Sequence, residues 1–128
     1  MPLGRESKLR LATCDPRLQQ LVSAVAADVD AGRVPGVKDI SVACGYRGKA
    51  DQDREFAEGD SQLPWPKSKH NTLPARAVDV WPYPVDWTGK GLPAFVALRR
   101  AFTATAVELG IRIHHISWDW PHHELVDK

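Results

Sequence analysis

The sequence predicts one domain that contains both α-helices and β-strands. The chain has 128 residues, a length at which a single domain buries roughly two-thirds of the surface of its unfolded chain. Apolar residues recur at helical spacing in two long segments, and shorter segments alternate between apolar and polar residues as strands do. We see no internal repeat and no low-complexity tract, so we expect a single domain over residues 1–128.

The first half of the chain predicts two helices and a strand. Asp15 is a good N-cap before a proline at the first helical position, and the apolar residues that follow share one face of a helix over residues 16–31. The segment Ile40–Cys44 alternates at period two and stops at Gly45, which predicts a half-buried strand. Residues 50–58 are rich in helix formers and predict a short polar helix.

The second half predicts loops, strands and one long helix. Residues 60–74 contain prolines and little periodicity, which predicts an exposed loop with His70 near its far end. A strand follows, in which successive side chains face opposite sides. A proline then opens a helix with an apolar stripe, which ends at Gly110. The predicted strand covers residues 77–81, the loop covers 82–91 and the helix covers 93–110. The two final strands are predicted at 111–116 and 121–126.

The composition limits the classes of partner. A formal net charge of +1 disfavours a protein that binds nucleic acid through a basic surface. The longest apolar run, at residues 24–27, is far too short to cross a bilayer, and the N-terminus lacks the pattern of a cleavable leader. We therefore expect no nucleic-acid partner, no membrane span, and a monomer that is made in the cytoplasm without a signal peptide.

Cys14 and Cys44 are the only cysteines, and their number excludes a structural zinc site built from cysteines alone. We expect two buried free thiols. A bridge between them remains open from the sequence, because sequence does not supply the distance between their Cα atoms.

Two segments about forty residues apart carry the groups of a metal site. The upstream segment holds His70 and Asp79, and residues 118–124 hold Asp119 and His122. Two histidines and one aspartate bind zinc and leave one position open, while a spare acid can act as a base. We assign His70, Asp79 and His122 as ligands of one zinc ion, and Asp119 as the general base that takes a proton from water and passes it to the leaving amine.

Strand alternation decides which of the paired histidines faces the metal. His122 and Glu124 project to one face of the last strand, and His123 and Leu125 to the other. Glu124 remains open between a partner that orients a ligand imidazole and an ordinary exposed acid. We expect the other histidines to face solvent or to pack by their rings, at positions 114, 115 and 123.

Four motifs in order resemble those of the LAS zinc peptidases, which include D-alanyl-D-alanine carboxypeptidases and phage L-alanyl-D-glutamate endolysins. They are Gly45-Tyr46-Arg47, Ser68-Lys69-His70, Ala77-Val78-Asp79 and Asp119-Trp120-Pro121-His122-His123-Glu124. Residues 68–84 are especially similar to the phage endolysin branch. The resemblance spans about residues 9–126 and covers nearly the whole chain.

The resemblance implies an α+β fold with a small antiparallel sheet packed with helices, like that of the DD-peptidase and Hedgehog zinc domains. It implies the same three zinc ligands and catalysis by Asp119. Arg47 would bind or polarise the scissile carbonyl or a substrate carboxylate, for which a planar cation is suited. Ser68 would steady the loop by a hydrogen bond, and Trp120 would shape the cleft.

The function that the resemblance favours is an endolysin-type L-alanyl-D-glutamate endopeptidase that hydrolyses the stem peptide of bacterial peptidoglycan. Such a phage protein would be made in the host cytoplasm, act at the cell wall after release, and work without a separate wall-binding module. Two alternatives remain: a D-alanyl-D-alanine carboxypeptidase with the same metal site, and a noncatalytic zinc-stabilised domain that binds cell-wall peptide.

Overall fold

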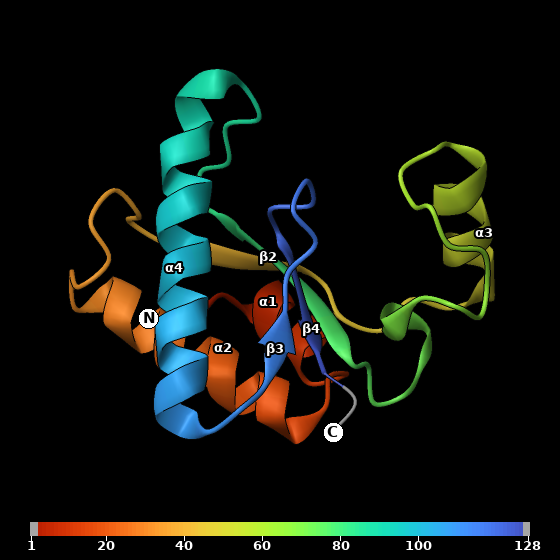
Figure 1. Cartoon of the computed structure of the whole chain (residues 1–128), viewed down its shortest axis with the longest axis horizontal. Helices are drawn as coiled ribbons and strands as arrows, with labels where there is room; N and C mark the ends of the chain where they lie inside the picture. Colours follow the sequence, from red (N-terminus) through yellow and green to blue (C-terminus); the bar gives the residue numbers. More distant parts are fainter. Residues whose placement is uncertain (1–2, 127–128) are drawn as a thin grey trace.

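The computed structural model describes residues 3–126 and contains a four-stranded sheet with helices on both sides (Figure 1). The strands follow the order β1-β2-β4-β3, and each neighbouring pair is antiparallel. The elements in chain order are α1 (Arg5–Leu11), α2 (Pro16–Asp30), β1 (Ile40–Cys44), α3 (Lys49–Ala57), the 3₁₀ helix η1 (Lys69–Asn71), β2 (Ala77–Pro82), the 3₁₀ helix η2 (Gly89–Gly91), α4 (Leu92–Leu109), β3 (Ile113–His114) and β4 (His122–Leu125).

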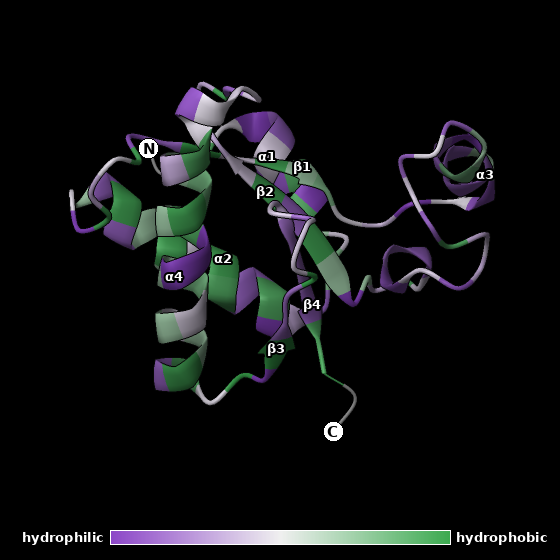
Figure 2. Ribbon diagram, turned by 45° about the horizontal axis from the view of Figure 1, so that its top comes forward, coloured by the Kyte–Doolittle hydropathy of each residue, from purple (hydrophilic) through white to green (hydrophobic). Residues whose placement is uncertain are grey.

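The core lies between the sheet and the helices α2 and α4, which lie on the opposite side of the sheet from α3 in Figure 1. Figure 2 shows apolar residues along α2, α4 and β2, whereas α3 is mostly hydrophilic. Each fully buried leucine or phenylalanine stabilises the fold by about 1.5–3 kcal/mol. The fully or almost fully buried apolar side chains include Leu18, Leu21, Val25, Val42, Val78, Val80, Leu98, Phe102 and Leu125.

The strongest local patterns in the sequence are confirmed. The helix α2 begins at Pro16, and the Asp15 side chain caps it by accepting a hydrogen bond from the Arg17 N–H at 2.9 Å. The strand β1 has the predicted bounds. The helix α4 ends at Gly110, which adopts a left-handed conformation with φ of 70°.

The helix α1 was not predicted, and its contacts explain why it forms. The Ser7 hydroxyl accepts a hydrogen bond from the Val42 N–H at 2.9 Å, and the Arg10 guanidinium donates to the Val42 carbonyl at 3.3 Å. Because β1 is an edge strand, these backbone groups have no strand partner on that side. The short helix therefore depends on tertiary contacts that cover the edge of the sheet.

Two predictions are wrong, one about an exposed loop and one about the length of a strand. Residues 60–74 do not form an exposed loop throughout, because Ser68, His70 and Asn71 are buried around η1. The backbone ties this turn to the domain, since the Arg47 N–H donates to the His70 carbonyl at 2.7 Å. The strand expected over residues 111–116 is only the two-residue β3, after which the chain turns toward β4.

The connections between strands place the site. The sheet presents one face to α4 and the other toward α3. None of the described helices is long and apolar enough to cross a membrane. A buried Gln52 fixes α3 to the segment that follows it, because its amide nitrogen donates to the Leu63 carbonyl at 2.6 Å and the Ser61 hydroxyl at 2.9 Å.

Candidate metal centre

Three neighbouring strands place polar side chains in one row across the sheet. Asp79 on β2 is the register partner of Cys44 on β1 and of His122 on β4. Directly opposed residues on neighbouring strands project to the same face. Here that face looks toward α3, and His70 reaches it from η1. The structure thus brings together all three residues that the sequence predicts as ligands.

The hydrogen bonds of the two histidines define which ring nitrogens face the centre of the site. The His70 Nδ1 lies 2.7 Å from the Gly45 carbonyl oxygen, which can only accept. The His122 Nε2 lies 2.8 Å from the Glu124 Oε1, which also accepts. Each of these nitrogens therefore carries the proton, and we assign the lone pairs to the His70 Nε2 and the His122 Nδ1.

These lone pairs converge on the Asp79 carboxylate. The His70 Nε2 and the His122 Nδ1 each lie 3.2 Å from the Asp79 Oδ1, and 3.3 Å from each other. Three facing acceptors repel one another unless a cation lies among them. Zinc–ligand bonds of about 2.0–2.1 Å in a tetrahedron separate the ligand atoms by about 3.3–3.4 Å. The donor types and their spacing therefore fit a zinc ion.

In the protein without metal, the pKa values of the site residues also favour positive charge at this position. Burial opposes the charged form of both imidazoles, but Asp79 outweighs it and raises the pKa of His70 to about 10. Asp79 and Glu124 together raise the pKa of His122 to about 9. Burial would raise the pKa of Asp79, yet the two imidazoles hold it far below its usual range. Protons therefore occupy the site when metal is absent.

Glu124 and Ser68 hold the two histidine ligands in place through hydrogen bonds on the side away from the metal position. The second Glu124 oxygen lies 3.1 Å from the Lys69 Nζ. The bond to His122, followed by that lysine, lowers the pKa of Glu124 to about 2, so this carboxylate stays ionised. The Ser68 hydroxyl accepts a hydrogen bond from the backbone N–H of His70 at 3.2 Å and caps η1. The Glu124 contact orients the His122 imidazole, and the Ser68 cap fixes the backbone that carries His70.

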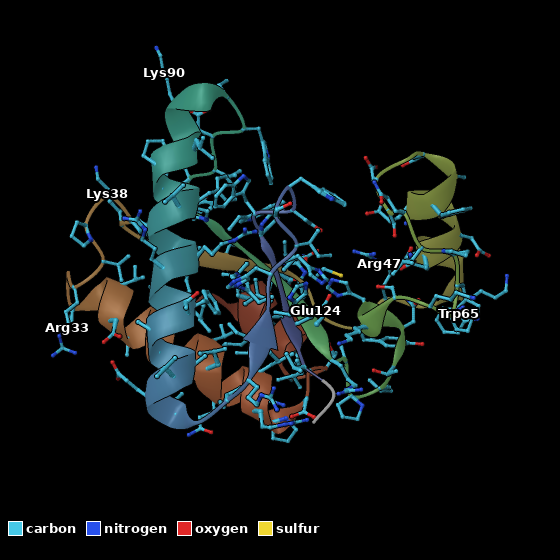
Figure 3. The ribbon with its side chains drawn as sticks, in the orientation of Figure 1. Arg33, Lys38, Arg47, Trp65, Lys90 and Glu124 are labelled. Carbon is cyan, nitrogen blue, oxygen red and sulfur yellow. The ribbon has the colours of Figure 1, made fainter. Side chains whose placement is uncertain are left out.

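Arg47 lines the metal-site side of the sheet rather than forming a surface ion pair (Figure 3). Its Nη2 lies 3.6 Å from the Asp79 Oδ2, and its Nη1 donates to the Gln52 Oε1 at 3.0 Å. The Asn71 side chain donates to the same Gln52 oxygen at 3.1 Å and to the Arg47 carbonyl at 3.0 Å. This buried network holds the guanidinium beside the carboxylate that faces the metal position.

Asp119 occupies the turn before β4, at the rim of the same site. Burial, followed by the charge of Asp79, raises the pKa of Asp119. Arg99 on α4 holds this turn, since its Nη2 donates to the carbonyls of Ile116 at 3.0 Å and Asp119 at 2.9 Å. The same guanidinium lies 4.2 Å from the centre of the Trp120 ring. Trp120 is not among the residues that line the metal cleft and instead lines a neighbouring hollow.

A cleft of about 410 Å³ opens over the site. The two histidines, Asp79 and Asp119 form one wall, and residues 60–63 after α3 form another. Three basic side chains also line it, namely Arg47, Lys67 and Lys69. Five acids line it too, and two of the bases are paired with them, Arg47 with Asp79 and Lys69 with Glu124. The cleft therefore offers a cation-binding centre with cationic side chains beside it.

The model of a family described as phage L-alanyl-D-glutamate peptidase matches residues 1–127. The chain belongs to this family. It is 35% identical over 121 residues to an L-alanyl-D-glutamate peptidase of Escherichia phage T5, which covers 91% of this chain and 80% of that relative. The crystal structure of the Serratia marcescens L-Ala D-Glu endopeptidase ChiX resembles it with a TM-score of 0.73 at 24% identity, over 95% of this chain and 87% of the other. The predicted family and fold are confirmed.

The structure of this family member also contains site residues that the sequence analysis missed. Cys44, expected to be an ordinary buried thiol, is free and half-buried, and its Sγ and the ligand atoms of His70 and Asp79 lie within 4.8 Å of one another. The register between β1 and β2 creates this proximity. No local sequence pattern indicates Gln52 or Asn71 as site residues, because their roles depend on the contact between α3 and η1.

The remaining histidines lie where the sequence analysis expected. His123 is fully buried, and its ring stacks on Phe102 of α4 with 3.7 Å between centroids. The His123 Nδ1 lies 2.7 Å from the His115 Nε2. His114 is exposed on β3. The alternation predicted for β4 therefore separates His122, in the cleft, from His123, in the core.

Proposed function

We propose that the chain is a zinc-dependent peptidoglycan hydrolase that cleaves the L-alanyl–D-glutamyl bond of the stem peptide. The observation that carries this proposal is the convergence of two imidazole lone pairs and a carboxylate oxygen at the floor of a cleft. The family of the chain supports the bond that we name. When bound, zinc supplies a Lewis acid that polarises a peptide carbonyl and acidifies water.

His70, Asp79 and His122 would hold the ion, and the surrounding hydrogen bonds keep them in place before it binds. Glu124 and the Gly45 carbonyl fix the two ring orientations, so binding requires no rearrangement of the imidazoles. This order lowers the entropic cost of assembling the site.

Asp119 would move the proton. Its carboxylate lies in the wall of the cleft and takes a proton from the attacking water, then gives it to the departing D-glutamyl amine. Burial disfavours the ionised form of this carboxyl and raises its pKa, and a single carboxyl can both accept and return a proton. Arg99 holds its backbone, which limits how far the carboxylate can move.

Arg47 would bind the substrate on the leaving-group side. Its guanidinium is fixed by Gln52 and Asp79, and Lys67 adds positive charge along the same cleft. D-Glutamate in the stem peptide carries a carboxyl group next to the scissile bond, and a fixed planar cation suits a carboxylate. We also propose that the protein acts as a monomer, since one chain supplies every group of this site.

The test is a digest of purified bacterial sacculi by the zinc-loaded protein, analysed by mass spectrometry and amino-terminal labelling. We expect new D-glutamyl amino termini and peptides that lack L-alanine. Release of free D-alanine instead would assign the carboxypeptidase reaction. A zinc-loaded protein that releases neither product would act as a binding domain and contradict the proposed reaction.

A further inference from the structure

A second hollow, of about 620 Å³, continues from the metal cleft and has a different chemical character. The two share part of their walls, at Glu55, Asp60, Trp118 and Asp119. We define the second hollow as the aromatic groove. Its far wall comes from Trp81, Trp87 and Phe95, and the turn before β4 adds Trp120. Trp81 belongs to β2 and Phe95 to α4. Trp87 comes from the segment before α4 and Trp120 from the β3–β4 connection, and both of these segments lie above the sheet in the view of Figure 1.

Trp87 is held rigidly while most of its surface remains free. Its ring meets Trp81 edge-on and Phe95 at a tilt, with 5.1 Å between centroids in each case. Even so, the residue is 61% exposed. The loop beneath it is closely packed, because a Cβ on Gly91 would overlap the Asp86 carbonyl oxygen. A fixed aromatic face of this kind binds a flat apolar surface with little loss of entropy.

Charge separates the aromatic groove from the metal cleft. Acids line both hollows, and three of them, Glu55, Asp60 and Asp119, are shared, but basic side chains line only the cleft. An anionic group of a ligand would therefore find cationic partners in the cleft and none among the residues that line the groove. Aromatic faces beside carboxylates and the Thr88 hydroxyl instead suit a neutral sugar, which offers C–H faces for stacking and hydroxyl groups that donate hydrogen bonds.

We propose that the aromatic groove binds the muramyl sugar to which the stem peptide is attached. This inference rests on the proposed function. In peptidoglycan the L-alanine is joined through a lactyl group to the sugar, so the ring lies about two residue lengths, or ~7 Å, from the scissile bond. The groove begins at Asp119, the proposed base, and therefore lies at a distance that this short link can span. The glycan would then occupy the aromatic groove and D-glutamate the part of the cleft beside Arg47, which fixes the direction of the substrate.

The experiment compares two soluble substrates that differ only in the sugar ring. One is N-acetylmuramoyl-L-Ala-D-Glu-L-Lys, and the other is the D-lactoyl form of the same peptide. We expect the zinc-loaded protein to cleave the muramoyl substrate with a kcat/KM about tenfold higher, as the loss of one stacking face would give. Trp87→Ala should abolish this preference and leave kcat/KM for the lactoyl peptide unchanged, while Trp87→Tyr should retain it.

Tyr83→Ala provides the matched control, because Tyr83 is 57% exposed and lies outside the groove. It should leave both rates as in the wild type. Equal kcat/KM for the two substrates in the wild type would overturn the sugar site while leaving the proposed function intact.

If neither substrate were cleaved, the proposed function would fail and binding would decide the inference. Tryptophan fluorescence of the protein would be titrated with the N-acetylglucosamine–N-acetylmuramic acid disaccharide. Saturable quenching that is lost in Trp87→Ala supports the sugar site. Quenching by the lactoyl peptide but not by the disaccharide would assign the groove to peptide and contradict the proposal.

Discussion

Replacing Gly45 by alanine should damage both the fold and the metal site. A Cβ at this position would overlap the Arg10 carbonyl oxygen and the Thr13 hydroxyl, and would lie 3.0 Å from the Cys14 Sγ. Neither oxygen can move freely, because the Thr13 hydroxyl donates to the Arg10 carbonyl at 2.6 Å and accepts from the Tyr46 N–H at 2.8 Å. The end of α1 would have to separate from β1. Overpacking of this kind costs about 2–3 kcal/mol.

The same shift would move the carbonyl that holds the His70 ring. Because the His70 Nδ1 lies 2.7 Å from the Gly45 oxygen, we expect zinc affinity to fall by about 10- to 100-fold. Thermal unfolding of the metal-free variant should show a Tm about 10 °C lower, and chelator competition should measure the affinity. Gly48→Ala is the control, since its Cβ would meet only Tyr46 ring atoms at 3.8 Å. Equal stability and zinc affinity in the two variants would refute this reasoning.

Three further predictions concern the site. Asp119→Asn should retain one zinc ion while kcat falls by a factor of order a hundred or more, and an unchanged kcat would remove Asp119 from the mechanism. Protons compete with zinc for His70 and His122, whose pKa values are raised to about 10 and about 9, so zinc affinity should rise with pH from about 6 to 8; a flat calorimetric profile would contradict this. Gln52→Leu removes one hydrogen-bond partner from the buried Asn71 amide and from the part-buried groups of Arg47, Ser61 and Leu63. It should lower the free energy of unfolding by about 3 kcal/mol in urea titrations, whereas a change below about 1 kcal/mol would show that the network is not stabilising.

Elements with strong local patterns could be predicted from the sequence. The Asp15–Pro16 cap and the period of β1 specify their elements without help from distant residues. The helix α1 and the turn η1 could not be predicted, because the first depends on the open edge of β1 and the second on backbone bonds to Arg47. The local sequence pattern indicates neither of these contacts.

The same division applies to the site. The three proposed ligands could be found because their residue types and motifs identify them, and strand alternation correctly distinguished His122 from His123. Cys44 and Gln52 could not be found in this way. The position of Cys44 follows from the register between β1 and β2, and that of Gln52 from the approach of α3 to η1. Both positions depend on tertiary contacts that no single segment of the sequence determines.

Calorimetric titration of the metal-free protein with zinc tests most directly whether two imidazoles and a carboxylate hold one ion. The wild type should bind one zinc per chain, and Asp79→Asn should weaken binding by several orders of magnitude. Glu108→Gln, which removes an exposed carboxylate on α4, should bind as the wild type does. Zinc binding that is equally tight in Asp79→Asn, or absent from the wild type, would contradict the metal centre.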